Sequence, residues 1–348
     1  MLEKYLDDLE NRIDAEVEED LLSQWNDFIG GRFDGSIFSP RRKTVSPAVV
    51  SWPRVFANDT LDDFELMALQ QLAACSGTLA DENGSIMNVR PNYGAGIVPS
   101  IFGAEIFLME HESDTLPISR PLNGGADAVK RAIEKGIPAL NSGYGGRCLA
   151  MAKYFTELFA GYPKAAKYIR IYHPDLQGPI DICDLLWGAE FFLNLVDNAE
   201  LVHAFLALIT ETYSRYMKEW ERVIPPRAGY SAHWGMMHKG RIMLRDDSAM
   251  NLSGEMFDEF IKPYDQKLLS EFGGGAIHFC GRGDHYIDRL AQMKCLYAVN
   301  MSQPECNDME TIFQHTIDKG IMLIGLSREA AETAVSRRRN LHGIVHCW

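Results

Sequence analysis

The segment 276–284 joins a short apolar run to a glycine-rich loop, and it carries an imidazole and a thiol two residues apart. Side chains alternate between the two faces of a β-strand, so we expect His278 and Cys280 to point the same way and Phe279 to point the other. An imidazole beside a thiol at the end of a strand is typical of a zinc site, or of a thiolate that a histidine activates. Two ligands do not complete a zinc site, so other segments must supply the rest.

A second cysteine at a predicted strand end could complete the site. Cys347 ends the last predicted strand, and two thiolates with one imidazole leave a coordination position open for a substrate. Zinc held in this way can bind a substrate thiol and lower its pKa, which makes a nucleophile at neutral pH. The alternative is that His278 is a hydrogen-bonded core histidine and that both cysteines are buried thiols. Other candidates for the third ligand are Cys295, Cys306, Glu305 and His285.

Polar side chains also follow the other predicted strands. Asp246 and Asp247 are adjacent, so we expect only one of their carboxylates to enter the pocket. That carboxylate could act as a general base, as a hydrogen-bond partner of His278, or as a substrate anchor; the alternative is a pair of solvated acids. We predict catalytic roles for Asp247, Asp175 and His285, and substrate-binding roles for Arg90, Tyr93, Gln177, Gln303 and Glu305.

The segment from His233 to His238 is apolar and aromatic and has a histidine at each end. It precedes a predicted strand, so it belongs to a loop. Two interpretations stay open: the loop closes over a ligand as a lid, or it is packed into the protein.

Short β-rich runs alternate with longer helical patterns along most of the chain, which predicts an α/β fold. The expected strands are 48–52, 85–90, 169–173, 241–246, 275–280, 296–300, 322–325 and 343–347. Eight evenly spread strands favour a single (β/α)8 TIM barrel over a doubly wound sheet, and the active site of a barrel lies at the carboxyl ends of its strands. Apolar residues at three- and four-residue steps predict one N-terminal helix over residues 1–30. We therefore expect residues 1–45 to pack, as a helix and a loop, on the outside of a barrel formed by residues 46–348.

The composition of the chain limits the kinds of molecule that we expect it to bind. The chain has 348 residues and a net charge of −14, which disfavours nucleic acid and anionic membranes and leaves a small-molecule substrate. The acidic N-terminus does not resemble a signal peptide, and no apolar run is long enough to span a bilayer. Seven widely spaced cysteines without a C-x-x-C pair fit a reducing compartment, so we expect a cytoplasmic protein.

Three motifs resemble the uroporphyrinogen decarboxylase superfamily: Ile277–Gly281 with Gly283-Asp284, Asn300–Glu305, and Asp175–Pro179 leading into Leu185–Gly188. The similarity runs from about residue 45 to the C-terminus. It implies a (β/α)8 barrel, often a homodimer, and it adds Trp187 to the substrate-binding residues. True decarboxylases of the superfamily carry an arginine-rich motif after the first strand, where this chain has Val50–Val55 with a single arginine. That departure speaks against porphyrinogen decarboxylation.

The second branch of the superfamily is similar to zinc-dependent methyltransferases that work with corrinoid proteins and thiols such as coenzyme M. Their His-x-Cys…Cys ligand pattern maps onto His278, Cys280 and Cys347. The chain lacks a D-x-H-x-x-G motif, so the resemblance implies a corrinoid carried by a separate protein. The alternative function is a metal-free decarboxylase or lyase acting on a small or tetrapyrrole carboxylate, with Arg90 or Arg282 as an anion clamp. A third hypothesis is a corrinoid- or tetrapyrrole-binding protein without enzymatic activity.

Overall fold

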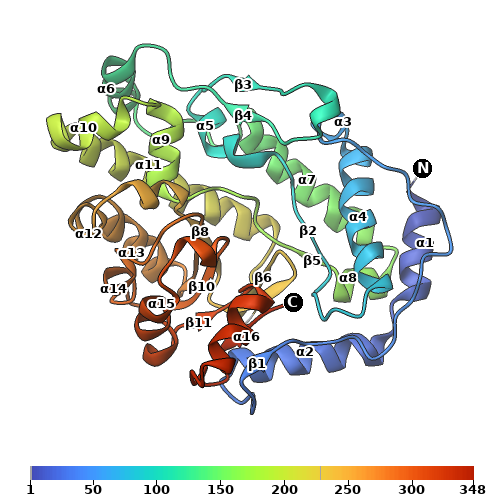
Figure 1. The fold of residues 1–348 in the computed structure, drawn as a ribbon. Coiled ribbons are helices and arrows are strands. Elements are labelled where there is room, and N and C mark those ends of the chain that lie inside the picture. The colour runs from blue at the N-terminus through green and yellow to red at the C-terminus, as the bar shows by residue number, and fades with distance from the viewer. Residues whose placement is uncertain (1, 228) are drawn as a thin grey trace.

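A computed structural model describes residues 2–227 and 229–348. Six strands form one parallel sheet in the order β1-β12-β11-β10-β9-β8 (Figure 1). They are β1 (Ile37–Phe38), β8 (Ile242–Arg245), β9 (Gly275–Phe279), β10 (Leu296–Met301), β11 (Met322–Leu323) and β12 (Val345–His346). A separate parallel pair consists of β2 (Asn88–Val89) and β5 (Arg170–Ile171). Within these described residues the eight strands are not joined into one continuous ladder, and the fold is a mixed α/β fold built on a parallel sheet.

Helices separate most of these strands. They are α3 (Ala57–Thr60), α4 (Phe64–Ala80), α5 (Ile97–Ile101), α6 (Gly125–Lys135), α7 (Gly143–Phe159), α8 (Pro163–Tyr168), α9 (Pro179–Trp187), α10 (Phe191–Asp197), α11 (Ala199–Val223), α12 (Gly254–Met256), α13 (Lys262–Glu271), α14 (Ile287–Leu290), α15 (Met309–His315) and α16 (Arg328–Ser336). Two antiparallel hairpins complete the chain: β3 (Ile106–Phe107) with β4 (Ile118–Ser119), and β6 (Tyr230–His233) with β7 (Met236–Lys239). None of the helices in the described part of the chain is long and apolar enough to cross a membrane.

The first strand differs from the expectation. Residues 48–52 form no strand and lie in a loop between two prolines, whereas Ile37–Phe38 pairs with Val345–His346. Proline removes a backbone donor and fixes φ, so a run flanked by Pro47 and Pro53 is poorly suited to a ladder. The other seven expected strands overlap observed strands.

The N-terminal segment forms two helices, α1 (Glu3–Arg12) and α2 (Ala15–Ile29), so the expectation of one continuous helix was wrong. The break falls at Asp14, whose side chain accepts hydrogen bonds from the first backbone N–H groups of α2 and caps it. Both Trp25 and Phe28 of α2 are fully buried against Phe38 of β1: the Phe28 ring stacks on it, and the Trp25 ring meets it edge-on. This helix is therefore part of the core of the fold and not an outer attachment.

The six-stranded sheet is buried on both faces, as parallel sheets usually are. One face, called the outer face here, carries Leu244, Ile277, Val299, Leu323 and Val345, which share a core with the surrounding helices. The opposite, inner face carries Met243, Ala276, Ala298 and Met322, which pack with Trp25 and Phe28. Met236 and Met237 of the β6–β7 hairpin belong to the same inner cluster. The segment from His233 to His238 is therefore packed against the sheet, in agreement with the second of its two interpretations.

Candidate metal centre

His278, Cys280 and Asp247 come together at the carboxyl ends of β8 and β9. The Nε2 atom of His278 lies 3.4 Å from Sγ of Cys280 and 3.5 Å from Oδ1 of Asp247. One ligand atom from each of the three residues lies within 4.8 Å of the others. The alternation of side chains along β9 brings the histidine and the cysteine together, because Ile277 and Phe279 point to the outer face.

Asn300 determines which nitrogen of His278 faces this group. Its amide nitrogen donates to the backbone oxygen of Ile324 at 2.6 Å, so its Oδ1 atom is left to accept a hydrogen bond from Nδ1 of His278, also at 2.6 Å. The proton of the imidazole therefore sits on Nδ1, and the lone pair of Nε2 points at Cys280 and Asp247. A histidine that ligates a metal is commonly oriented in this way. Asn300 pairs with His278 in the register of β9 and β10.

The loop after β8 delivers Asp247. Its backbone N–H and that of Ser248 donate to the buried carboxylate of Asp181 at 2.9 and 2.8 Å. The Oδ1 atom of Asp247 accepts the backbone N–H of Cys280 at 2.8 Å. Asp246 is fully buried on the other side, beside Asp265 of α13, where burial and the second carboxyl raise its pKa well above its usual range. One carboxylate of the pair thus reaches the site, as the alternation predicts.

The donor set fits zinc. Tetrahedral zinc with bonds of about 2.0 Å to nitrogen and about 2.3 Å to sulfur places these two ligand atoms roughly 3.5 Å apart. Burial lowers the pKa of His278, so its imidazole is neutral and able to ligate. Burial raises the pKa of Cys280, although the hydroxyl of Ser302 counters this effect, so a bound cation must displace the thiol proton. Asp247 and Cys280 are both partly exposed, which leaves access for a fourth ligand.

Cys347 does not join this group. In β12, His346 faces the inner cluster, where its ring lies 4.7 Å from that of Trp25, and Val345 faces the outer core. Cys347 therefore points to the outer side, where it is fully buried in the core shared with α16. Its backbone N–H donates to Phe38. Because side chains alternate along a strand, His278 and Cys280 share the inner face and Cys347 lies on the outer one. Asp247 takes the position in the ligand group that was expected for Cys347.

A cluster of charged residues lies beside the metal centre. The carboxylate of Asp175 pairs with the guanidinium groups of both Arg90 and Arg245. Arg245 is 2% exposed and is aligned with His278 across β8 and β9. Its guanidinium stacks 4.7 Å from the ring of Trp234, and that ring meets the His278 ring edge-on at 5.1 Å. One carboxylate serves two cations here, so the cluster carries a surplus positive charge near the candidate ligands.

The remaining predicted residues have other positions. Tyr93 is fully buried against Tyr144, and Trp187 is buried in the helical layer against Phe191. Both are core residues, so the structure does not place them with the metal centre. Gln177 is also buried, in a left-handed backbone conformation with φ of 66°. Its neighbour Gly178 donates to the backbone oxygen of Arg245, which ties the loop after β5 to β8.

The loop after β9 is held by side chains that follow β10. Gln303 accepts the backbone N–H of Gly281, and Oδ1 of Asn307 accepts that of Gly283 at 2.7 Å. His285 contacts the backbone oxygen of Leu252 through Nε2 at 2.8 Å, so it joins this loop to the one after β8 and takes no part in the metal group. Glu305 is exposed and lines a cavity between α15 and α16, away from the metal group. Gln303 and His285 therefore position the site, and Glu305 lies apart from it.

A comparison with solved structures supports the fold. The chain is similar to a methyltransferase from Methanosarcina mazei, with a TM-score of 0.65 over 94% of this chain and 92% of that chain, at 16% sequence identity. No protein-family model and no curated protein sequence matches the chain. At this identity the likeness establishes the fold that the two proteins share.

Proposed function

We propose that this protein is a zinc-dependent methyltransferase whose metal is held by Asp247, His278 and Cys280. The convergence of these three ligand atoms at one edge of the sheet carries the proposal, because the distances from Nε2 of His278 to the other two, 3.4 and 3.5 Å, are those of a tetrahedral zinc site. A carboxylate in place of the expected Cys347 thiolate leaves the charge of the ligand set unchanged. Zinc bound there would lower the pKa of a coordinated substrate thiol and hold it as a thiolate.

The chain's own residues prepare this site. Asn300 keeps the Nε2 lone pair of His278 turned toward the other two ligands, and Asp181 fixes the backbone that carries Asp247. The surplus charge of Arg90 and Arg245 suits an anionic group on the substrate.

We further propose that the eight strands form a (β/α)8 barrel and that the methyl donor is a corrinoid on a separate protein. Homodimer formation remains part of the proposal as well.

The arginine cluster also favours a second candidate function. In a metal-free decarboxylase or lyase, Arg90 would hold a substrate carboxylate beside Asp175. This alternative requires neither a bound metal nor a thiol substrate. It predicts CO2 release by the metal-stripped protein.

Elemental analysis separates the two candidates. The purified full chain is expected to hold about one zinc per chain, and it should transfer a methyl group from methylcobalamin to 2-mercaptoethanesulfonate only when zinc is bound. Protein prepared with zinc in the medium that still binds none would overturn the proposal. Full zinc occupancy together with no methyl transfer to any of a panel of thiols would retain the metal site and overturn the reaction.

A further inference from the structure

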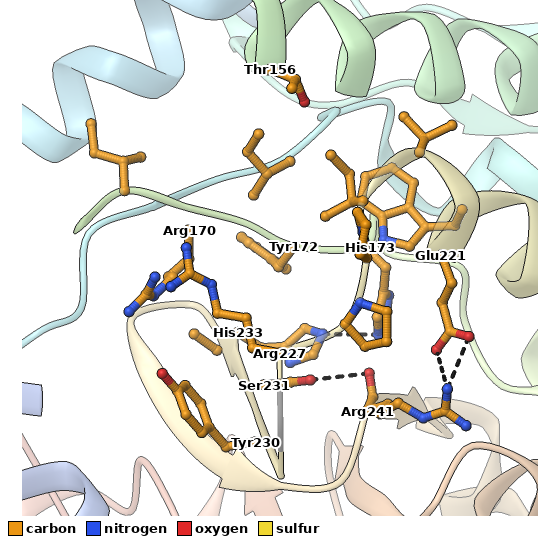
Figure 2. Close-up of a pocket in the computed structure, with 18 of the residues that line it drawn as sticks. Thr156, Arg170, Tyr172, His173, Glu221, Arg227, Tyr230, Ser231, His233 and Arg241 are labelled. Carbon is orange, nitrogen blue, oxygen red and sulfur yellow. Dashed lines mark hydrogen bonds and ion pairs between the residues drawn. The ribbon is translucent and has the colours of Figure 1, made fainter. Parts of the chain in front are cut away.

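A cavity that contains none of the three candidate metal ligands lies beside β5 and the start of β8, and Figure 2 shows residues that line it. It has a volume of about 290 Å³ and is bounded by α7, α11, the start of β5 and the β6–β7 hairpin. Apolar side chains of the two helices form one wall, among them Phe159, Met217 and Trp220. The hairpin and β5 supply the polar part of the lining. A cavity of this size accommodates a ligand of roughly 10 to 15 non-hydrogen atoms.

The cavity carries uncompensated positive charge. Arg241 is paired with Glu221 at 2.8 Å, and Figure 2 shows this pair on the side away from Arg170. Neither Arg170 nor Arg227, which also line the cavity, pairs with an acid among residues 2–227 and 229–348. Arg170 is 7% exposed, and its Nε atom has no hydrogen-bond partner. A buried guanidinium with an unused N–H is poised to bind an anion.

Three buried histidines are joined in a row, and two of them, His173 and His233, line this cavity. Nε2 of His173 lies 2.9 Å from Nε2 of His233, and Nδ1 of His233 lies 2.8 Å from Nε2 of His238. The outer nitrogens at both ends face backbone oxygens: Nδ1 of His173 faces that of Pro174 at 2.9 Å, and Nδ1 of His238 faces that of Lys239 at 2.8 Å. A carbonyl oxygen only accepts, so both outer nitrogens must donate.

When all three histidines are neutral, they have one N–H proton fewer than their four contacts need. Four contacts need four N–H protons, and three neutral imidazoles supply three. Nε2 of His173 has a single lone pair, and the backbone N–H of Met243 already donates to it at 3.3 Å, so the proton of neutral His233 is placed on Nδ1, which donates to Nε2 of His238. With all three histidines neutral, Nε2 of His173 and Nε2 of His233 are then both without a proton, although they lie 2.9 Å apart. One additional proton between them would complete every hydrogen bond.

Burial and the nearby charges determine whether the histidines can bind that additional proton. Burial, together with the nearby Arg245, lowers the pKa of His173 to about 3 and that of His238 to about 4. Arg90 also repels a charge on His233, whereas Asp175 is shared between the two arginines. Tyr172 and the Arg241–Glu221 pair line the cavity and add no net charge. Without a ligand the histidine chain therefore stays neutral and short of one hydrogen bond. A negative charge in the cavity would offset the cost of the fourth proton.

We propose that this cavity is a second ligand site for a small organic acid with an apolar body, and that the acid binds together with one proton taken up by the histidine chain. The apolar wall holds the body of the acid, and Arg170 and Arg227 bind its carboxylate. The proton enters between His173 and His233, which both line the cavity. This site is independent of the proposed metal centre.

Titration calorimetry of the full chain tests the proposal, with 3-phenylpropionate as the probe and its neutral amide as the matched comparison. The carboxylate is expected to bind at least about tenfold more tightly than the amide. Titrations at pH 7 and pH 6 in two buffers of different ionisation enthalpy should show proton uptake on carboxylate binding that increases as the pH falls. Equal affinity for acid and amide, absence of binding up to about 10 mM, or binding without proton uptake would each overturn it.

Variants separate the two parts of the proposal. Arg227→Gln changes an exposed side chain and so leaves the fold intact, and it should weaken carboxylate binding about tenfold. Arg131→Gln, on α6 and outside the cavity lining, is the control and should have no effect. In His173→Gln the side-chain amide can donate to Nε2 of His233, so the carboxylate should bind without proton uptake. Unchanged uptake in this variant would contradict the assigned position of the proton.

Discussion

The amide oxygen of Asn300 lies 2.6 Å from Nδ1 of His278, and the same amide donates its N–H to Ile324. These two contacts fix both the orientation of the amide and the tautomer of the imidazole. Since the two residues are partners in the register of β9 and β10, the sheet itself aligns the histidine with the other ligands. The geometry of the proposed metal site therefore depends on a residue that is not one of its three candidate ligands.

Asn300→Ala should weaken zinc binding by about 10- to 100-fold, because the histidine loses the partner that orients it. Competition with a chromogenic chelator measures the change. Asn11→Ala, at an exposed position in α1, is the matched control and should bind zinc like the wild type. An unchanged zinc affinity in a correctly folded Asn300→Ala protein would refute the orienting role.

The two cysteines should respond differently to the same substitution. Cys280→Ser removes a ligand and should abolish stoichiometric zinc binding, as measured by elemental analysis. Cys347→Ser should keep zinc and lower the free energy of unfolding by about 1–3 kcal/mol, because it places a hydroxyl in the apolar layer beside α16. Loss of zinc from both variants would restore the His-x-Cys…Cys assignment in place of ours.

The local patterns predicted much of this arrangement. Strand alternation brought His278 and Cys280 to one face and allowed a single carboxylate from Asp246 and Asp247 to enter the site. Applied to His346 and Cys347, the same rule would have turned one of them away, but only the fold shows which face is which. The inward position of His346 against Trp25 depends on α2, whose packing on the sheet leaves no local signal.

Other features depend on contacts between distant segments. Tyr93 and Trp187 follow motifs that suggest a pocket, yet the helices around them close and bury both. The first strand was missed because two residues beside prolines carry little periodicity, and only the partner strand β12 defines Ile37–Phe38 as part of the sheet. Asn300 was visible as a polar strand end, and the pairing of neighbouring strands could have identified it as the partner of His278.

Zinc binding should depend on pH with the release of one proton. In the metal-free protein burial raises the pKa of the Cys280 thiol above its usual value, so the thiol is protonated at neutral pH. Burial lowers the pKa of His278, so its imidazole is already neutral between pH 7 and 8 and loses no proton. The apparent affinity should therefore rise about tenfold per pH unit over this range. Chelator competition at several pH values measures the slope, and a slope of zero or two would contradict this protonation scheme.

Asp175→Asn should destabilise the fold by about 3 kcal/mol in urea unfolding at pH 7, because it leaves Arg90 and Arg245 without their shared carboxylate. Burial alone would raise the pKa of Asp175, but the two arginines lower it below its usual value. A depressed pKa contributes stability that is present above the unfolded value of about 3.9 and is lost as the pH falls through the folded value. The stability difference between wild type and variant should therefore shrink in acid, whereas Asp127→Asn, exposed on α6, should show no difference at any pH. A difference that stays constant down to pH 2 would show that Asp175 acts through packing and not through its charge.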